Sequence, residues 1–96
     1  MYILITYDVD TIRDDGKKRL RQVAKACRDY GQRVQNSVFE CELNEAQYSM
    51  LIHKLSDIID KQLDSIRFYI LSKNENRRIV TIGKETSYNV NEAIII

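Results

Sequence analysis

The distribution of apolar and polar residues divides the chain into strands and helices. Residues 2–7 form an almost unbroken run of aliphatic, aromatic and β-branched side chains, and a polar stretch from Asp8 to Asp15 follows it. A short apolar run with polar borders predicts a strand that is central in a sheet and buried on both faces. Asp8 then stands at the end of this strand, where the following loop leaves its side chain open to solvent.

The next segment has the periodicity of an amphipathic helix, with basic residues on the arc opposite the apolar one. The apolar positions are Leu20, Val23, Ala24, Cys27 and Tyr30. Asp14 or Asp15 is predicted to cap this helix, with Gly16 in its first turn. Gly31 is predicted to end it.

Residues 32–43 form a second strand region whose alternation is interrupted. The apolar side chains from Phe39 to Leu43 alternate with glutamates and mark an inward face, whereas Val34 has the other parity. One straight strand cannot place both sets on the same face, because its side chains alternate with a period of two. A bend, a bulge or a tight turn is therefore expected at residues 36–37, and a turn would give two short antiparallel strands.

A second helix and two further strands complete the pattern. Residues 45–61 carry an apolar stripe at helical spacing, and Asn44 with Gln47 has the spacing of a capping box at its start. Residues 65–71 alternate as a strand, and residues 79–82 form a last strand before a glycine.

With the interruption counted as a turn, this order of elements is that of a split βαβ unit. The predicted fold is an α+β, ferredoxin-like βαββαβ sandwich with an extra C-terminal strand, in which an antiparallel sheet carries two helices on one face. A simpler β-α-β-α-β-β layer with one bent strand is the alternative. The ferredoxin-like domain is predicted at residues 1–83, and a linker with an apolar tail at residues 84–96. The tail ends in three isoleucines, so we expect it to dock on its own body or on another chain.

Composition and length exclude several classes of protein. The chain has 96 residues, which fits one domain, and its apolar fraction of 44% excludes a disordered chain. No apolar stretch reaches the roughly 20 residues that span a membrane, and the N-terminal run lacks the features of a signal peptide, so we expect a cytoplasmic protein. Cys27 and Cys41 are too isolated for a disulfide framework or a zinc site and are predicted to be small buried side chains.

The charges are distributed unevenly, although the net charge is only +1. Residues 1–35 carry eight basic and five acidic side chains, whereas residues 36–64 carry two basic and six acidic ones. A basic first helix can bind phosphate groups, but it can also be an ordinary solvated helix face. The chain has no phosphate-binding glycine loop, no paired zinc ligands and no nucleophile elbow. The candidate chemistry is therefore an acidic pair, Asp8 with Asp10, beside a basic helix.

Four segments of the chain match a known family in order and spacing. They are Tyr7-Asp8-Val9 at the end of the first strand, Arg19-Leu20 in the first helix, YGQRVQNSVFE at residues 30–40, and DSIRFY at residues 64–69. Together they resemble the small CRISPR-associated Cas two family over about residues 1–83. The stretch at residues 30–40 is the most specific of the four.

The resemblance implies a homodimer of ferredoxin-like protomers in which the last strand pairs with the partner's sheet. The family is variable beyond Gly83, so the resemblance does not say whether the tail docks on the dimer partner or on another chain. Members of the family work in spacer acquisition, a step of antiviral defence, where they bridge two dimers of the CRISPR integrase and hold a short DNA duplex. Several are described as metal-dependent endonucleases of RNA or double-stranded DNA.

The resemblance also assigns a role to Asp8. The aspartate at the end of the first strand is the metal ligand of the family, and two copies would face each other across the two-fold axis of the dimer. The implied catalytic chemistry is phosphodiester hydrolysis, with Mg²⁺ or another divalent cation such as Mn²⁺ held by Asp8 and its symmetry mate. Asp10 lies in the less regular loop and is not assigned as a ligand.

Arg19 and Arg33 are the candidates for phosphate contact, because the planar guanidinium group matches the geometry of phosphate. Each could equally be an ordinary surface charge. The supporting basic residues are Lys17, Lys18 and Arg21.

Two aromatic residues are further candidates beside the site. Tyr7 could flank Asp8, although packing in the core is its commoner role. Phe39 matches the family motif, but its alternation with neighbouring apolar residues favours burial. The predicted function is a dimeric nucleic-acid-binding bridge for the integrase with metal-dependent endonuclease chemistry. The alternative is a non-catalytic ferredoxin-like regulatory or binding module.

Overall fold

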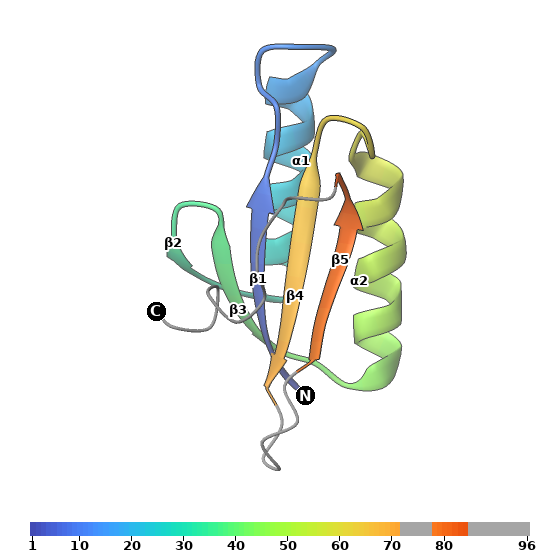
Figure 1. Cartoon of the computed structure of the whole chain (residues 1–96). Coiled ribbons are helices and arrows are strands. Elements are labelled where there is room, and N and C mark those ends of the chain that lie inside the picture. The colour runs from blue at the N-terminus through green and yellow to red at the C-terminus, as the bar shows by residue number, and fades with distance from the viewer. Residues whose placement is uncertain (72–77, 85–96) are drawn as a thin grey trace.

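The structure, a computed structural model, describes residues 1–71 and 78–84 (Figure 1). Within these residues it contains two helices and five strands, which confirms the predicted α+β class. In chain order they are β1 (Tyr2–Asp8), α1 (Gly16–Arg28), β2 (Gly31–Gln35), β3 (Val38–Glu42), α2 (Glu45–Ile58), β4 (Ser65–Leu71) and β5 (Arg78–Gly83).

The five strands form one antiparallel sheet in the order β2-β3-β1-β4-β5. This is the predicted ferredoxin-like arrangement, with β5 added at the edge beyond β4. The alternative with one bent strand is excluded, because β2 and β3 are separate paired strands. Both helices lie on the same face of the sheet, and no described helix covers the opposite face, which is called the open face below (Figure 1).

β1 is the central strand, as predicted, but it is buried on one face only. Ile3 and Ile5 belong to the core and are fully buried. Leu4 and Thr6 point to the open face and are only half-buried, and Asp8 on the same face is exposed. The prediction of burial on both faces is wrong, because the two helices cover a single face of the sheet.

Both ends of α1 differ from the prediction in detail. Asp15 occupies the N-cap position in a left-handed conformation (φ 60°), but its side chain accepts no capping hydrogen bond. At the other end Arg28 is the last helical residue, and Gly31 begins β2 instead of ending the helix. Asp29 keeps a right-handed conformation and donates its N–H to the carbonyl oxygen of Lys25, so this helix end requires no glycine.

α2 begins with the predicted capping box. The Asn44 side chain accepts a hydrogen bond from the backbone N–H of Gln47 (2.8 Å), and the Gln47 side chain accepts one from the backbone N–H of Asn44 (3.0 Å). The helix ends at Ile58 and not at residue 61, because Ile59 turns to an extended conformation and packs into the core.

A tight turn at residues 36–37 separates β2 from β3, as expected from the interrupted alternation. Ser37 takes the left-handed conformation of this turn (φ 64°). The pairing register also shifts between Arg33 and Gln35, so the region contains a bulge as well as a turn.

Two predicted segments lie mostly outside the described residues. They are the polar turn at residues 73–78, of which the structure describes Arg78, and the tail at residues 84–96, of which it describes Lys84. Among the helices that the structure describes, none is long and apolar enough to cross a membrane.

Cys27 on α1 and Cys41 on β3 are free thiols in the core, as predicted. Burial raises the pKa of the Cys27 thiol to about 12 and that of the Cys41 thiol to about 11. Both thiols therefore stay protonated at neutral pH and act as apolar side chains.

We expect both thiols to resist alkylation in the native protein, because the thiolate is the reactive form. Near pH ~8 iodoacetamide should leave the native chain unmodified over a time in which the urea-unfolded chain gains a label at each cysteine, as measured by mass spectrometry. Labelling of native and unfolded chains at equal rates would contradict this burial.

The free energy of unfolding should also fall as the pH rises above 9.0, because the unfolded chain then releases thiol protons that the native chain retains.

Candidate functional site

Asp8 is the last residue of β1 and lies opposite Ser65, the first residue of β4. Its side chain is exposed on the open face, and it has no hydrogen-bond or ion-pair partner within residues 1–71 and 78–84. A carboxylate of this kind, on a paired strand end, is free to bind a hard cation. No group of three or more side chains that could hold a metal ion occurs in the described part of the chain, so Asp8 does not belong to such a group there.

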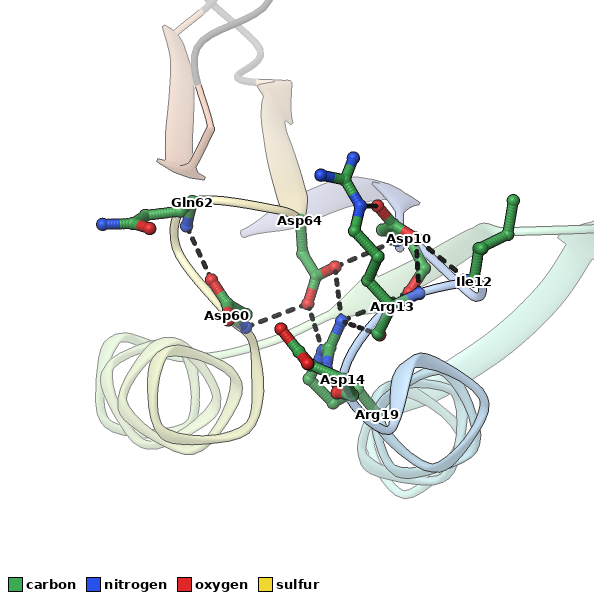
Figure 2. Close-up of polar contacts among 8 residues, drawn as sticks. All are labelled: Asp10, Ile12, Arg13, Asp14, Arg19, Asp60, Gln62 and Asp64. Atoms are coloured by element: carbon green, nitrogen blue, oxygen red, sulfur yellow. Dashed lines mark hydrogen bonds and ion pairs between the residues drawn. The ribbon is translucent and has the colours of Figure 1, made fainter.

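The loop that follows β1 is shaped by Asp10 (Figure 2). Its carboxylate accepts hydrogen bonds from the backbone N–H groups of Ile12 (2.9 Å) and Arg13 (3.1 Å), and it forms an ion pair with the Arg13 Nε (3.0 Å). The backbone donors, Ile12 first, lower the pKa of the Asp10 carboxyl, with a smaller effect from the Arg13 guanidinium. Asp10 is thus engaged in a turn, which agrees with leaving it out of the metal ligands.

Asp64 is fully buried, with 0% of its surface exposed, and it joins two loops at the same end of the sheet (Figure 2). One carboxylate oxygen accepts the backbone N–H of Asp10 (3.0 Å), and the other accepts that of Asp60 (2.9 Å). The same two oxygens accept hydrogen bonds from Arg19, at 2.8 Å from Nε and 3.4 Å from Nη2. Asp64 therefore ties the loop before β4 to the loop after β1 and to α1.

Arg19 is buried and faces this pair of loops instead of solvent. Besides its ion pair with Asp64, its guanidinium donates to the backbone carbonyl oxygens of Asp14, of Asp10 (3.2 Å) and of Arg13 (3.4 Å). The hydrogen bond to Asp64 is the main cause that raises the pKa of Arg19. Because the guanidinium is engaged in this way, we assign Arg19 a structural role and leave it out of the proposed phosphate contacts.

The backbone that Arg19 holds has an unfavourable conformation. Asp14 (φ 46°) and Asp15 (φ 60°) are consecutive residues in the left-handed region, which persists only when the surroundings stabilise it. Gly16 then begins α1 so close to the carbonyl group of Asp10 that a Cβ atom at this position would collide with it. The loop therefore depends on the Arg19 hydrogen bonds and on a glycine at the start of α1.

The other basic candidates lie around a cleft of about 620 Å³ between α1 and the β2–β3 turn, on the helix side of the sheet. Its lining residues are Tyr7, Leu20, Arg21, Ala24, Lys25, Arg28, Arg33, Asn36 and Ser37. Arg21 and Arg33 were predicted as site residues, whereas Lys25 and Arg28 were not. The spacing of Arg21, Lys25 and Arg28 by four and three residues indicates one helix face, and this signal was present in the sequence.

Lys17 and Lys18 lie in the first turn of α1, where both are exposed. They line a second, shallower hollow of about 550 Å³, which shares Arg21 with the cleft. The hollow also includes Asp15 and the exposed Ile12, so its charge is more mixed than that of the cleft.

The two aromatic candidates stack on each other, and one of them contacts Arg33. The guanidinium carbon of Arg33 lies 5.2 Å from the centre of the Phe39 ring, a distance typical of a cation–π contact. Phe39 is fully buried, and its ring stacks on that of Tyr7 at 6.2 Å between centroids. Phe39 therefore contacts Arg33, and Tyr7 is one of the residues that line the cleft.

The candidate residues do not form a single site. Tyr7 and Asp8 are neighbours in β1, so their side chains point to opposite faces of the sheet. Asp8 lies on the open face, whereas Tyr7, Arg21 and Arg33 lie on the helix side. Within one protomer the sheet separates the free carboxylate from the basic cleft.

The fold and these groups define a small ferredoxin-like protein with an exposed carboxylate on one face of its sheet and a basic cleft on the other. The chain belongs to the Cas2 family, since the family model described as CRISPR associated protein Cas2 matches residues 1–79. The family inferred from the sequence is thereby confirmed.

Individual relatives match nearly the full length of the chain. A Rhodospirillum rubrum protein named CRISPR-associated endoribonuclease Cas2 3 is 50% identical over 94 residues, which cover 98% of this chain and 99% of the relative. A Halalkalibacterium halodurans protein named CRISPR-associated endonuclease Cas2 is 47% identical over 95 residues, with 99% of each chain covered. The crystal structure of Streptococcus pyogenes Cas2 at pH 6.5 is similar with a TM-score of 0.70 and 59% identity, covering 77% of this chain and 89% of that one.

The geometry predicts that Asp64→Asn strongly destabilises the protein. The substitution leaves the buried Arg19 guanidinium without its counter-charge, which costs about 3 to 5 kcal/mol in comparable buried pairs. Urea unfolding followed by circular dichroism measures the change in the free energy of unfolding.

Arg13→Gln is the matched control, because it removes an ion pair of the same loop whose arginine side chain is 67% exposed. An exposed pair contributes little to stability, so the unfolding midpoint of Arg13→Gln should stay close to that of the wild type. Equal midpoints for Asp64→Asn and Arg13→Gln would show that the buried pair does not have the stabilising role assigned to it.

Proposed function

We propose that this chain acts as a homodimeric, metal-dependent endonuclease that binds nucleic acid during CRISPR spacer acquisition. The observation that carries the proposal is the exposed carboxylate of Asp8 at the end of the central strand, which has no partner among the residues that the structure describes. The names of the relatives, which are CRISPR-associated endonucleases or endoribonucleases, support the same reaction class. The proposed substrate is RNA or double-stranded DNA.

The surroundings of Asp8 favour a metal-binding role. β1 is paired on both sides, and the loop that follows Asp8 is held by the bond between the Asp10 N–H and the buried Asp64. A carboxylate on such a fixed base loses little conformational freedom when it binds a cation. Asp8 is accordingly the proposed catalytic residue and metal ligand, with Mg²⁺ or Mn²⁺ as the cation.

A second copy of the chain would complete this site. The open face carries Asp8 together with apolar side chains that are half-buried or exposed, namely Tyr2, Leu4, Tyr69 and Leu71. Covering these side chains is favourable, and a two-fold axis that crosses this face near Asp8 would bring two Asp8 carboxylates together. Two adjacent carboxylates repel each other unless a cation lies between them, so the dimer would form the site that one protomer lacks.

The proposed chemistry assigns a limited part to the protein itself. Mg²⁺ held by Asp8 would supply a water molecule of lowered pKa and would offset the negative charge that develops on the phosphate. The two Asp8 carboxylates would hold and orient the cation, while the basic residues on the helix side of the sheet would bind phosphates elsewhere on the nucleic acid. In this scheme Tyr7 does not reach the metal, because it points to the opposite face of the sheet.

Nucleic-acid binding is the second part of the proposal, and it does not require hydrolysis. Lys17 and Lys18 are exposed beside Arg21, and none of the three forms an ion pair with a described residue. Such unpaired cations favour contact with the phosphate backbone of a duplex. We also propose that this chain, as a homodimer, bridges two dimers of the CRISPR integrase. The relatives described above give no support to the alternative of a regulatory module.

The test of the catalytic proposal is Asp8→Asn, which keeps the shape of the side chain and removes its charge. With Mg²⁺ present, cleavage of defined RNA and duplex DNA substrates should fall by about 100-fold or more, because a bound cation contributes several kcal/mol to the transition state. Mn²⁺ titration should show in parallel that the variant has lost its cation site.

Asp57→Asn on the outer surface of α2 is the control, since Asp57 is exposed and distant in sequence from the site residues. This variant should cleave and bind Mn²⁺ like the wild type. Duplex binding at two salt concentrations should be the same for Asp8→Asn and wild type, because the proposed phosphate contacts do not include Asp8. Cleavage by Asp8→Asn at the wild-type rate would remove Asp8 from the mechanism.

A further inference from the structure

The cleft between α1 and the β2–β3 turn combines an apolar floor with surrounding basic side chains, which a flat basic surface does not. Three residues, Tyr7, Leu20 and Ala24, give it an apolar floor, and basic side chains stand around them. Its volume of about 620 Å³ falls in the range of ligand-binding pockets, which is roughly 300–1,000 Å³. The cleft can therefore enclose part of a ligand.

The charges of the cleft are all of one sign. Arg21, Lys25 and Arg28 come from one face of α1, and Arg33 comes from β2 on the other side. No acidic side chain lines the cleft, and none of the four forms an ion pair with any residue in the described ranges 1–71 and 78–84. Like charges around one cavity repel each other, so an anion in the cleft would be stabilised by all four.

The stability of α1 explains only part of this cluster. Lys25 and Arg28 stand in the last turn of the helix, where a positive charge interacts favourably with the helix dipole. Arg21 lies in the middle of the helix, and Arg33 belongs to a strand, so neither gains from the dipole. The guanidinium of Arg33 moreover contacts the buried ring of Phe39, which favours its position at the cleft. A guanidinium that lines a cleft is suited to binding a phosphate group.

We infer that this cleft binds a single unpaired nucleotide of a nucleic-acid strand. The base or sugar lies against the apolar floor, and the phosphate lies among the four cations. The inference rests on the proposed nucleic-acid binding. It adds a binding position for one unpaired nucleotide, separate from the contacts to the duplex. In a paired duplex the faces of the bases are stacked on one another and only their edges are accessible in the grooves, so a duplex would leave the apolar floor of the cleft unused. An unpaired nucleotide offers an apolar face and a phosphate together, which matches both parts of the cleft.

Two substitutions test the two parts of the cleft. Ala24→Leu fills the floor and keeps all four cations, whereas Arg33→Gln removes a cation and keeps the floor. The probes are a blunt DNA duplex and the same duplex with a single-stranded overhang, and the readout is fluorescence anisotropy. Both variants should lose about tenfold or more of the affinity that the overhang adds, while Ala24→Leu binds the blunt duplex like the wild type.

The controls separate this site from general effects of charge and volume. Lys54→Gln and Ala46→Leu make the same kinds of change at exposed positions of α2, and both should bind the two probes like the wild type. In the wild type, NMR amide signals of Ala24 and Ser37 should shift when the overhang probe is added, and this measurement stands if Ala24→Leu fails to fold. A free nucleoside monophosphate and inorganic phosphate, added as competitors, should displace the overhang far less well than a single-stranded oligonucleotide.

Each other outcome rejects a defined part of the account. If Ala24→Leu has no effect on overhang binding and the two amide signals do not shift, the cleft inference is wrong even though the chain binds nucleic acid. If the free monophosphate or phosphate competes as well as the strand, the cleft binds a free anion and not a strand. If the wild type binds neither duplex, the proposed nucleic-acid binding itself fails.

Discussion

The buried ion pair between Arg19 and Asp64 is the interaction on which the end of the sheet that carries Asp8 depends. It closes two loops that are distant in sequence, and its remaining hydrogen bonds satisfy backbone groups of both. A buried charge is tolerated only when it is paired and fully hydrogen-bonded, so the two side chains require each other. The loop after β1, with its two left-handed aspartates, is stable because Arg19 holds its carbonyl groups. Asp8 projects from the strand end that this arrangement fixes.

The sheet then divides the molecule into two surfaces with different proposed roles. Because successive side chains of a strand alternate, Asp8 faces the open side and its neighbour Tyr7 faces the basic cleft. The free carboxylate lies on the surface proposed for dimerisation, and the cations lie on the outer, helix-covered side. Because of this separation the two proposed roles are independent of each other. Phosphodiester hydrolysis would need two copies of the chain, whereas binding of a nucleotide in the cleft would need only one. A substitution on one face can therefore change one role without the other.

Local patterns were sufficient to predict most of the fold, and the errors have identifiable causes. Helical and strand periodicity gave the element order, and the capping box of α2 was readable because its two residues are neighbours. The apolar run of β1 predicts burial on both faces, and this is wrong, since a sequence does not show which face of the sheet the helices leave open. The role of Asp64 was missed because its partner Arg19 is 45 residues away and no local pattern connects them. Lys25 and Arg28 can be predicted from the sequence as candidate site residues, because they share a helix face with Arg21.

Amide hydrogen exchange of the wild-type protein tests the central claim most directly. The Asp10 N–H donates to the buried Asp64, whereas the Ile12 N–H donates to the more accessible carboxylate of Asp10 itself. The account predicts that the Asp10 amide exchanges as slowly as the amides at the centre of β1, and much more slowly than that of Ile12. Exchange of the Asp10 and Ile12 amides at the same fast rate would show that Asp64 does not hold the loop that follows Asp8.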